Sequence, residues 1–198
     1  MQFDEGYIKF RAHWTHTEAL PLPELHELMH WRTHLYALGL IGVYPDGIGY
    51  GNISRRRGSA GQFIISGSAT GQLAELSAEH FCLVTRVAAA QNTVWCEGPI
   101  IASSETMSHA VIYEHCPEVG GVIHVHHAAL WRTLLHRVPT TPPEVTYGSP
   151  AMAEAIRQLL EKTDLRGQGL FVMAGHPEGI FAFGHNLAAA AAVLLEHF

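Results

Sequence analysis

The sequence predicts a single layered α/β domain with a largely antiparallel sheet. Helix-like and strand-like segments are interspersed along all 198 residues, and at least two pairs of strand-like segments have links too short for a parallel crossover. Since 47% of the residues are hydrophobic and only 15% are charged, a chain of this length can bury one core but is too short for two ordinary domains. No repeat, linker or low-complexity segment divides the chain, so we expect one domain over residues 1–198.

The first half of the chain predicts one helix, a turn-rich segment and three strands. Residues 1–22 are expected to form an irregular N-terminal extension. Residues 24–39 carry apolar side chains at helical spacing up to Gly39, which is typical of an amphipathic helix. The segment 43–58 is dense in glycine and predicts tight turns. β-Branched and aromatic residues then predict strands at 63–66, 81–88 and 92–98.

The second half of the chain predicts helices with recognisable starting residues. Ser103 and Ser104 are N-cap candidates for a helix that stops at Pro117. Ser149 followed by Pro150 starts another helix, and Asn186 caps a final alanine-rich one. Between these helices we expect a strand at 120–128, a short helix at 130–137 and a hairpin of two strands at 169–175 and 179–184.

Composition excludes several classes of function. The formal net charge is -6, and the longest basic run is Arg55–Arg57, so we expect no nucleic-acid partner. The odd number of cysteines, without a CxxC pair, argues against a disulfide framework or a thiolate zinc site. The N-terminus lacks the layout of a secretory signal, and no apolar stretch reaches membrane-spanning length. The sequence therefore predicts a cytoplasmic protein that does not bind membranes.

Two histidines on the strand predicted at 120–128 indicate a metal site. Side chains at positions i and i+2 of a strand leave the same face, so His124 and His126 point together and can chelate one ion. His176 follows another predicted strand, where a turn can bring it against the pair, and three histidines with an open position form a catalytic arrangement. The alternative is a chance HxH pairing on a solvated strand in a chain with 15 histidines.

A second set of histidines competes for the metal. His26, His30 and His34 repeat at i, i+4 and i+8 and line one stripe of the predicted helix. The stripe has no nearby set of carboxylates and hydroxyls, and a polar helix flank explains it. We therefore favour the strand pair with His176.

Several motifs along the chain resemble those of the class II aldolase and adducin family. They occur in the family's order and spacing from about residue 35 onward. The motifs are YGNIS (50–54), SGSATG (66–71), ASSE (102–105), HVHH (124–127), YGSPAMAEAI (147–156) and GHPEGIFAFG (175–184). The resemblance implies a three-layer α/β/α fold around a mostly antiparallel sheet, usually assembled as a homotetramer with active sites at subunit interfaces.

The resemblance also implies roles for individual residues. His124, His126 and His176 correspond to the family's ligands for Zn²⁺, with another divalent ion such as Mn²⁺ as the alternative. Glu105 corresponds to the catalytic acid/base carboxylate, although a capping glutamate would also suit its position. The positions that bind the substrate phosphate in family enzymes correspond to Asn52, Thr70, Gly71, Ser103 and Ser104. A turn-forming role alone explains Asn52 and the glycines equally well.

The chain also departs from the family pattern near the predicted site. The segment between the HxH strand and Tyr147 is short, and the interface tyrosine that protonates the leaving aldehyde group in family aldolases has no evident counterpart. His176 is followed by Pro177 and Glu178 rather than directly by glycine. Tyr147 and His109 are candidate proton donors, whereas Glu178 is expected to be an exposed turn residue.

Together these features predict a zinc-dependent lyase that acts on a small hydroxy-carbonyl compound, with sugar phosphates among the candidates. The resemblance implies aldol cleavage through a metal-stabilised enediolate. An epimerase, a dehydratase or a decarboxylase using the same machinery is the alternative, because a fold does not choose among them. A non-catalytic adducin-like binding module is a further alternative, but adducin-type domains lose the metal histidines that this chain retains.

Overall fold

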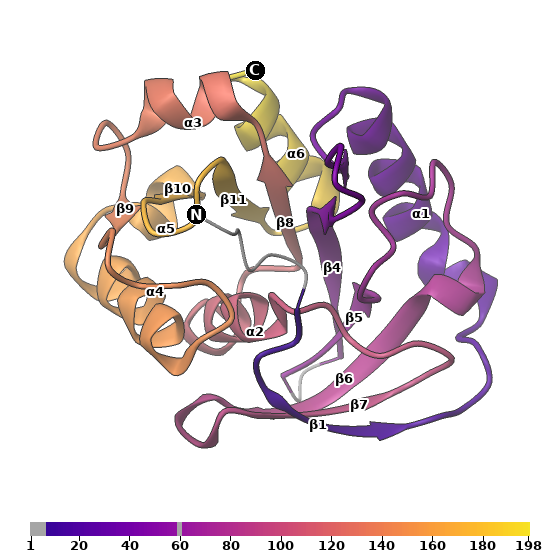
Figure 1. The fold of residues 1–198 in the computed structure, drawn as a ribbon. Coiled ribbons are helices and arrows are strands. Elements are labelled where there is room, and N and C mark those ends of the chain that lie inside the picture. Colours follow the sequence, from indigo (N-terminus) through magenta and orange to yellow (C-terminus); the bar gives the residue numbers. More distant parts are fainter. Residues whose placement is uncertain (1–6, 59–60) are drawn as a thin grey trace.

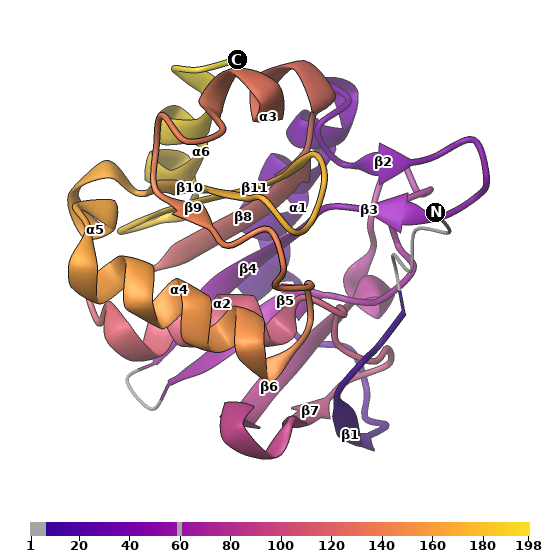
Figure 2. The same cartoon turned by 60° about the vertical axis from the view of Figure 1, so that its left-hand side comes forward.

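The chain folds around one large sheet covered by helices on both faces. The computed structural model describes residues 7–58 and 61–198. Helices α1 (Leu22–Ala37) and α6 (Leu187–Leu195) cover one face, and helices α2 (Thr106–His115) and α4 (Pro150–Lys162) cover the other (Figure 1). Figure 2 shows the strands between the two helix layers. The predicted three-layer α/β/α architecture is thus confirmed.

The large sheet is mostly antiparallel. Its strand order is β1-β7-β6-β5-β4-β8-β11-β10-β9, and only the outermost pairs, β1 with β7 and β10 with β9, are parallel. The first strands are β1 (Arg11–Thr15), β4 (Asn52–Arg57), β5 (Gln62–Ser66), β6 (Phe81–Ala88) and β7 (Thr93–Glu97). The later strands are β8 (Gly121–His126), β9 (Thr140–Thr141), β10 (Leu170–Met173) and β11 (Gly179–Gly184).

The remaining elements are short. Strands β2 (Gly42–Val43) and β3 (Gly49–Tyr50) form a separate small hairpin. The short helices are η1 (Ala78–His80), η2 (Ala89–Gln91), α3 (Ala128–Leu134) and α5 (Leu165–Gln168). No helix of the described residues is long and apolar enough to cross a membrane.

Two hydrophobic cores lie on the two faces of the sheet, and strand alternation divides residues between them. On β8, Ile123 and Val125 join the core under α1 and α6, whereas Val122 joins the core under α2 and α4. By the period of two, His124 and His126 face the second side. The side of the sheet under α2 and α4 therefore carries the metal candidates.

The local starting signals at three helices have different outcomes. Ser149 and Asn186 cap α4 and α6 as predicted, because their side chains accept hydrogen bonds from Met152 N–H and Ala189 N–H. The hydroxyl cap predicted for α2 is wrong. Glu105 occupies the N-cap position of that helix without a capping hydrogen bond, and the two serines before it stay in the loop.

The prediction that residues 1–22 are irregular requires a correction, although residues 1–6 lie outside the described range. Arg11–Thr15 forms β1, and α1 already begins at Leu22. β1 is an edge strand held by parallel pairing with β7 and by the hydrogen bond from Trp14 Nε1 to the carbonyl of Gly98. Since its side chains are mostly exposed, no alternating hydrophobic pattern marks it.

Strand β4 was also missed within the glycine-rich segment. Its three consecutive arginines hide the strand pattern, yet each guanidinium has an anchor away from the predicted metal site. Arg55 and Arg57 bind Glu24, and Arg56 donates to three backbone carbonyls at the end of α2 and in the loop that follows. The arginines therefore fix β4 to its neighbours rather than adding charge to the site.

Candidate metal centre and active site

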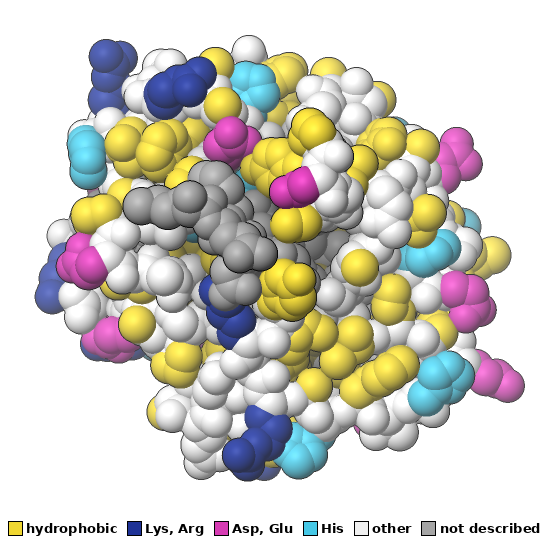
Figure 3. Space-filling model, viewed as in Figure 1, with side chains coloured by type: hydrophobic (Ala, Val, Ile, Leu, Met, Phe, Trp, Pro, Cys, Tyr) yellow, Lys and Arg dark blue, Asp and Glu magenta, His cyan; other side chains and the backbone are white. Residues whose placement is uncertain are grey.

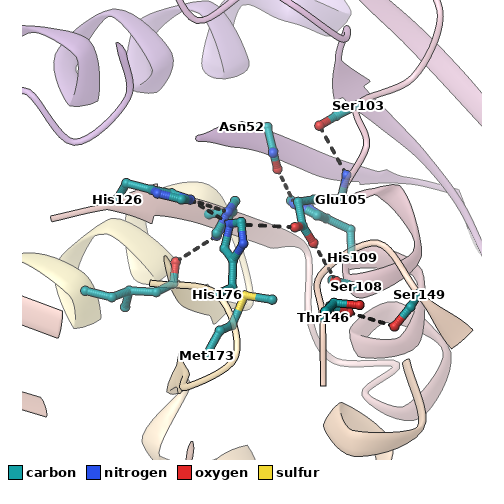
Figure 4. A network of polar contacts seen from close by, with 12 residues as sticks. Asn52, Ser103, Glu105, Ser108, His109, His126, Thr146, Ser149, Met173 and His176 are labelled. Atoms are coloured by element: carbon teal, nitrogen blue, oxygen red, sulfur yellow. Dashed lines mark hydrogen bonds and ion pairs between the residues drawn. The ribbon is translucent and has the colours of Figure 1, made fainter. Parts of the chain in front are cut away.

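Strand pairing brings the three predicted metal histidines together. β11 runs antiparallel to β8 with Gly179 opposite His126, so the turn that precedes β11 carries His176 to the same end of the sheet. The Nε2 atom of His126 lies 3.1 Å from Nε2 of His124. It lies 2.9 Å from Nε2 of His176, and Figure 4 shows these two side chains facing each other. A side chain at Gly179 would collide with this cluster, because its Cβ would lie 2.5 Å from Cδ2 of His176. Three imidazole nitrogens thus converge on one point.

Hydrogen bonds on the opposite ring nitrogens orient two of the imidazoles. Nδ1 of His124 donates to the carbonyl of Ile180 over 3.2 Å, which leaves its Nε2 unprotonated. Nδ1 of His126 lies 2.8 Å from the hydroxyl of Tyr44. Partners of this kind fix the tautomer of a metal-binding histidine.

Burial keeps the three histidines in the neutral form that binds metals. All three are at most 4% exposed. Burial lowers the pKa of His124 to about 3. It lowers the pKa of His126 and His176 well below the ordinary value, with repulsion from neighbouring histidines as a further cause. Three neutral nitrogens fit zinc or a similar divalent ion, which uses three protein ligands and one open position in catalytic sites.

Glu105 is the carboxylate beside the histidine cluster. Its side chain is buried, with Oε2 accepting a 2.8 Å hydrogen bond from the hydroxyl of Ser108. Oε1 lies 4.0 Å from Nε2 of His176 and accepts no hydrogen bond from any described residue. Burial raises the pKa of Glu105 to about 7, an effect that the Ser108 hydrogen bond and the charge of Lys9 partly offset. One oxygen of a basic carboxylate is therefore available beside the metal position.

A pocket opens in front of these groups. Its lining includes every predicted site residue except His126: Asn52, Thr70, Gly71, Ser103, Ser104, Glu105, His124 and His176. Residues far apart in the sequence meet here because β4 pairs with β8, which sets Asn52 opposite His124. Tyr50 and Tyr147 complete the lining with aromatic side chains.

The loop at 66–71 offers backbone donors to the pocket. Ala69 has a φ of 56°, a left-handed conformation that can form an anion-binding concavity of successive N–H groups. Within the described part of the chain, the N–H groups of Ala69, Thr70 and Gly71 donate no hydrogen bond. Gly71 is required by space, since a Cβ there would lie 2.3 Å from the carbonyl oxygen of Gly42.

Arg32 holds this loop from behind and was not found from the sequence. Its guanidinium is buried and donates to the carbonyls of Thr70, Gly71 and Ala74. Burial lowers its pKa to about 10, so it remains charged at neutral pH. The available signal was the helical spacing that places Arg32 on the same face of the helix as Leu28 and Leu35, because a buried arginine requires partners.

A buried chain of hydrogen bonds orients Asn52. His109 Nε2 lies 2.6 Å from Oδ1 of Asn52, and its Nδ1 lies 2.7 Å from the hydroxyl of Ser54. Ser54 also contacts the hydroxyl of Tyr113 at 2.9 Å. Because Oδ1 of Asn52 can only accept, Nε2 of His109 carries the proton, and the amide NH₂ of Asn52 is left for the pocket. His109 therefore positions Asn52, a role that the sequence does not indicate, since it suggests His109 only as a candidate proton donor.

Lys9 adds a positive charge from the N-terminal segment. Its Nζ lies 3.8 Å from the centre of the Tyr147 ring, and that ring lies 4.5 Å from the ring of His176. The charge of Lys9 is also among the causes that lower the pKa of His176 and Glu105. No signal in the sequence connects residue 9 with residues 105, 147 and 176, since the contact depends on how the segment crosses the domain.

The competing histidine stripe lies elsewhere. His26, His30 and His34 are exposed on α1, and among the described residues only His124, His126 and His176 group as metal ligands. His127 caps α3, and its ring packs against that of Phe198. On the face shown in Figure 3, the Lys and Arg side chains of the described residues are scattered and form no single basic patch.

Fold and site together define a three-layer α/β domain with a histidine centre fit for one divalent metal ion. The chain belongs to the class II aldolase and adducin N-terminal domain family, whose model matches residues 35–197. A comparison with curated proteins found no significant match.

Solved structures share this fold at low sequence identity. An L-fuculose 1-phosphate aldolase is 20% identical with a TM-score of 0.66, over 90% of this chain and 82% of its own. A sugar-phosphate aldolase from Thermotoga maritima is 16% identical with a TM-score of 0.65, over 89% and 91% of the two chains. The L-fuculose-1-phosphate aldolase from Thermus thermophilus is 20% identical with a TM-score of 0.59, over 89% and 87%.

Proposed function

We propose that the protein is a zinc-dependent lyase that cleaves a small hydroxy-carbonyl compound by an aldol reaction. One observation carries the proposal: a buried carboxylate oxygen of Glu105 lies 4.0 Å from His176 Nε2, beside three converging histidine nitrogens. Family membership and the likeness to aldolases of sugar phosphates support the same reaction class. Another divalent ion such as Mn²⁺ is the alternative, because metal availability as well as ligand type decides which ion a site takes up.

The chain's own residues account for substrate binding and proton transfer. When bound, the metal ion polarises the substrate carbonyl and makes the neighbouring C–H acidic. In the condensation direction Glu105 accepts that proton at Oε1. In cleavage the β-hydroxyl of the substrate loses its proton, the carbon–carbon bond breaks, and Glu105 returns a proton to the carbon next to the carbonyl. Ser108 holds the other carboxylate oxygen and so fixes the plane of the carboxylate. A bound cation also favours the ionised form of Glu105, which is the form that removes a proton.

The far end of the pocket supports an anionic group on the substrate. The N–H groups of the 69–71 segment and the loop serines can receive a phosphate or carboxylate, and buried Arg32 supplies a positive charge behind them. We therefore propose a phosphorylated or acidic substrate. We also propose a homotetramer, because the family typically assembles as an oligomer, and light scattering of the purified protein tests it.

The decisive experiment follows proton exchange rather than overall turnover. The wild type should carry about one equivalent of zinc and exchange the C–H protons of dihydroxyacetone phosphate in deuterated water. Glu105→Gln should keep the metal and lose about 10²- to 10⁴-fold of the exchange rate, the range for one general base. Glu114→Gln, an exposed glutamate on α2, is the matched control and should exchange like the wild type.

Wild-type exchange in Glu105→Gln would remove Glu105 from the mechanism. Unphosphorylated dihydroxyacetone, run in parallel, tests the anionic group, since equal exchange of both compounds would contradict the phosphate site. A screen that identifies products then separates the alternatives. Aldol cleavage yields two carbonyl fragments, whereas an epimerase keeps the carbon skeleton and a decarboxylase releases carbon dioxide.

A further inference from the structure

A tyrosine and a glutamate outside the pocket lining form a hydrogen-bonded chain that ends on His126. The hydroxyl of Tyr44 lies 2.8 Å from Nδ1 of His126, and it donates to Oε2 of Glu178 over 2.9 Å. The ring nitrogen involved is the one opposite Nε2, which faces the other two histidines. The chain therefore contacts the metal centre from behind.

Both members of this chain are fixed in place by their surroundings. Tyr44 follows β2 in a turn closed by hydrogen bonds to Ile48 and Gly47, and its ring packs 4.6 Å from that of Tyr50. Glu178 lies in the turn between β10 and β11, where its carbonyl accepts the N–H of His127 at the end of β8. The β8 backbone thus holds the glutamate beside the histidine that it reaches through Tyr44.

Glu178 also has a backbone conformation that disfavours its side chain. Its φ is 70°, in the left-handed region where glycine is relaxed and other residues are uncommon. A glutamate at this position costs stability that a glycine would not. The side chain of Glu178 therefore has a role other than forming the turn.

The carboxylate of Glu178 sets which atom donates and which accepts in both hydrogen bonds between Glu178, Tyr44 and His126. An ionised carboxylate can only accept, so the tyrosine hydroxyl points its proton at Glu178. The tyrosine oxygen is then left to accept the proton on Nδ1 of His126. That arrangement leaves Nε2 of His126 unprotonated, as a metal ligand must be. Without the carboxylate, Tyr44 can donate to Nδ1 instead, which favours the tautomer whose Nε2 carries the proton.

We propose that Glu178 and Tyr44 form a positioning relay that holds His126 in its metal-binding tautomer and orientation. The relay rests on the proposed function, because it acts on the ion that the three histidines bind. Tyr44 and Glu178 do not touch the substrate in this scheme. They raise metal affinity through His126 alone.

The test measures zinc affinity by chelator competition in the full-length protein. Glu178→Gly removes the carboxylate where glycine suits the backbone, so the metal-free variant should have a urea midpoint at or above that of the wild type while zinc affinity falls about 10- to 100-fold. Tyr44→Phe should lose affinity in the same range. Tyr50→Phe is the matched control, since its ring also packs on His126 but its hydroxyl donates to the carbonyl of Gly39, and zinc affinity should stay within about twofold of the wild type.

Three further measurements separate a relay from a general packing effect. The double variant Tyr44→Phe/Glu178→Gly should bind zinc no more weakly than the weaker single variant, because Glu178 acts only through Tyr44. Glu178→Gln keeps an accepting oxygen and should recover part of the affinity. In the zinc-loaded wild type, proton NMR should show a slowly exchanging, downfield Nδ1 proton on His126 that moves in Tyr44→Phe and stays in Tyr50→Phe.

The outcomes distinguish the relay from the proposed function. Wild-type zinc affinity in both single variants, or fully additive losses in the double variant, would overturn the relay and leave the metal site standing. A wild type that binds no divalent ion would overturn both.

Discussion

Two groups of histidines in this chain are regularly spaced, but one group is buried and the other is exposed. His124 and His126 on β8 are buried, and together with His176 they direct nitrogens at one point. His26, His30 and His34 repeat along α1 with the same regularity, yet all three are exposed. The helix turns its leucines toward the core, so the histidine stripe faces outward.

The difference shows what spacing can and cannot specify. Spacing on one element decides which side chains share a face, but a metal centre also needs burial, fixed tautomers and a ligand from another element. β8 meets these requirements because it is central in the sheet and its neighbour β11 follows directly after the turn that carries His176. The stripe on α1 meets none of them among the described residues.

The largest expected effect is on metal binding. His126→Ala should lower zinc affinity by more than about 100-fold, beyond the loss expected for an outer partner, because it removes the nitrogen central to the cluster. His30→Ala, the matched change in the stripe, should leave affinity within about twofold of the wild type. Equal metal content in both variants, measured by elemental analysis after dialysis, would contradict the claim that the buried cluster rather than the exposed stripe binds the metal.

The next effect is a dependence of stability on pH in the metal-free protein. Burial lowers the pKa of His109 well below 6.5, so the unfolded chain takes up a proton first as the pH falls. The free energy of unfolding should therefore be highest above about pH 6.5 and fall below it, with His109 contributing up to about 1.4 kcal/mol per pH unit.

Urea unfolding with chelator, between about pH 7 and pH 5, measures this slope. His109→Gln should have the shallower slope, and His34→Gln should keep the wild-type slope. Glu105 acts in the opposite sense. Because its pKa is raised in the folded protein, its contribution lowers the free energy of unfolding as the pH rises from 4.5 toward about 7. That contribution is common to all three proteins and cancels in the differences. Parallel slopes in all three would contradict a neutral, buried His109.

The smallest effect is on stability at neutral pH. His109→Gln should cost about 1–3 kcal/mol, because Ser54 and Asn52 lose their shared buried partner. His34→Gln changes an exposed side chain and should stay within about 0.5 kcal/mol of the wild type. Urea midpoints at pH 7 compare the two, and equal midpoints would show that the His109 chain is dispensable for folding.

Much of the fold follows from local patterns, and the failures have identifiable causes. The hairpin strands β10 and β11 and the caps at Ser149 and Asn186 depend on neighbours within a few residues, and the sequence predicts them. Strand β1 depends on pairing with residues 93–97, and nothing near residue 11 reveals that partner. The α2 start was misplaced because Ser103 and Ser104 have the chemistry of caps but line the pocket instead.

The sequence by itself determined that His124 and His126 share a face and that the motifs belong to one family. The period of a strand and the order of motifs are properties of the chain alone. The sequence also named His176 as the third histidine. Only the tertiary structure decided that Arg32 and Lys9 bring charge toward the pocket and that Glu178 reaches His126 through Tyr44. These contacts join residues many positions apart, so they depend on how the helices, turns and strands of the whole domain pack together.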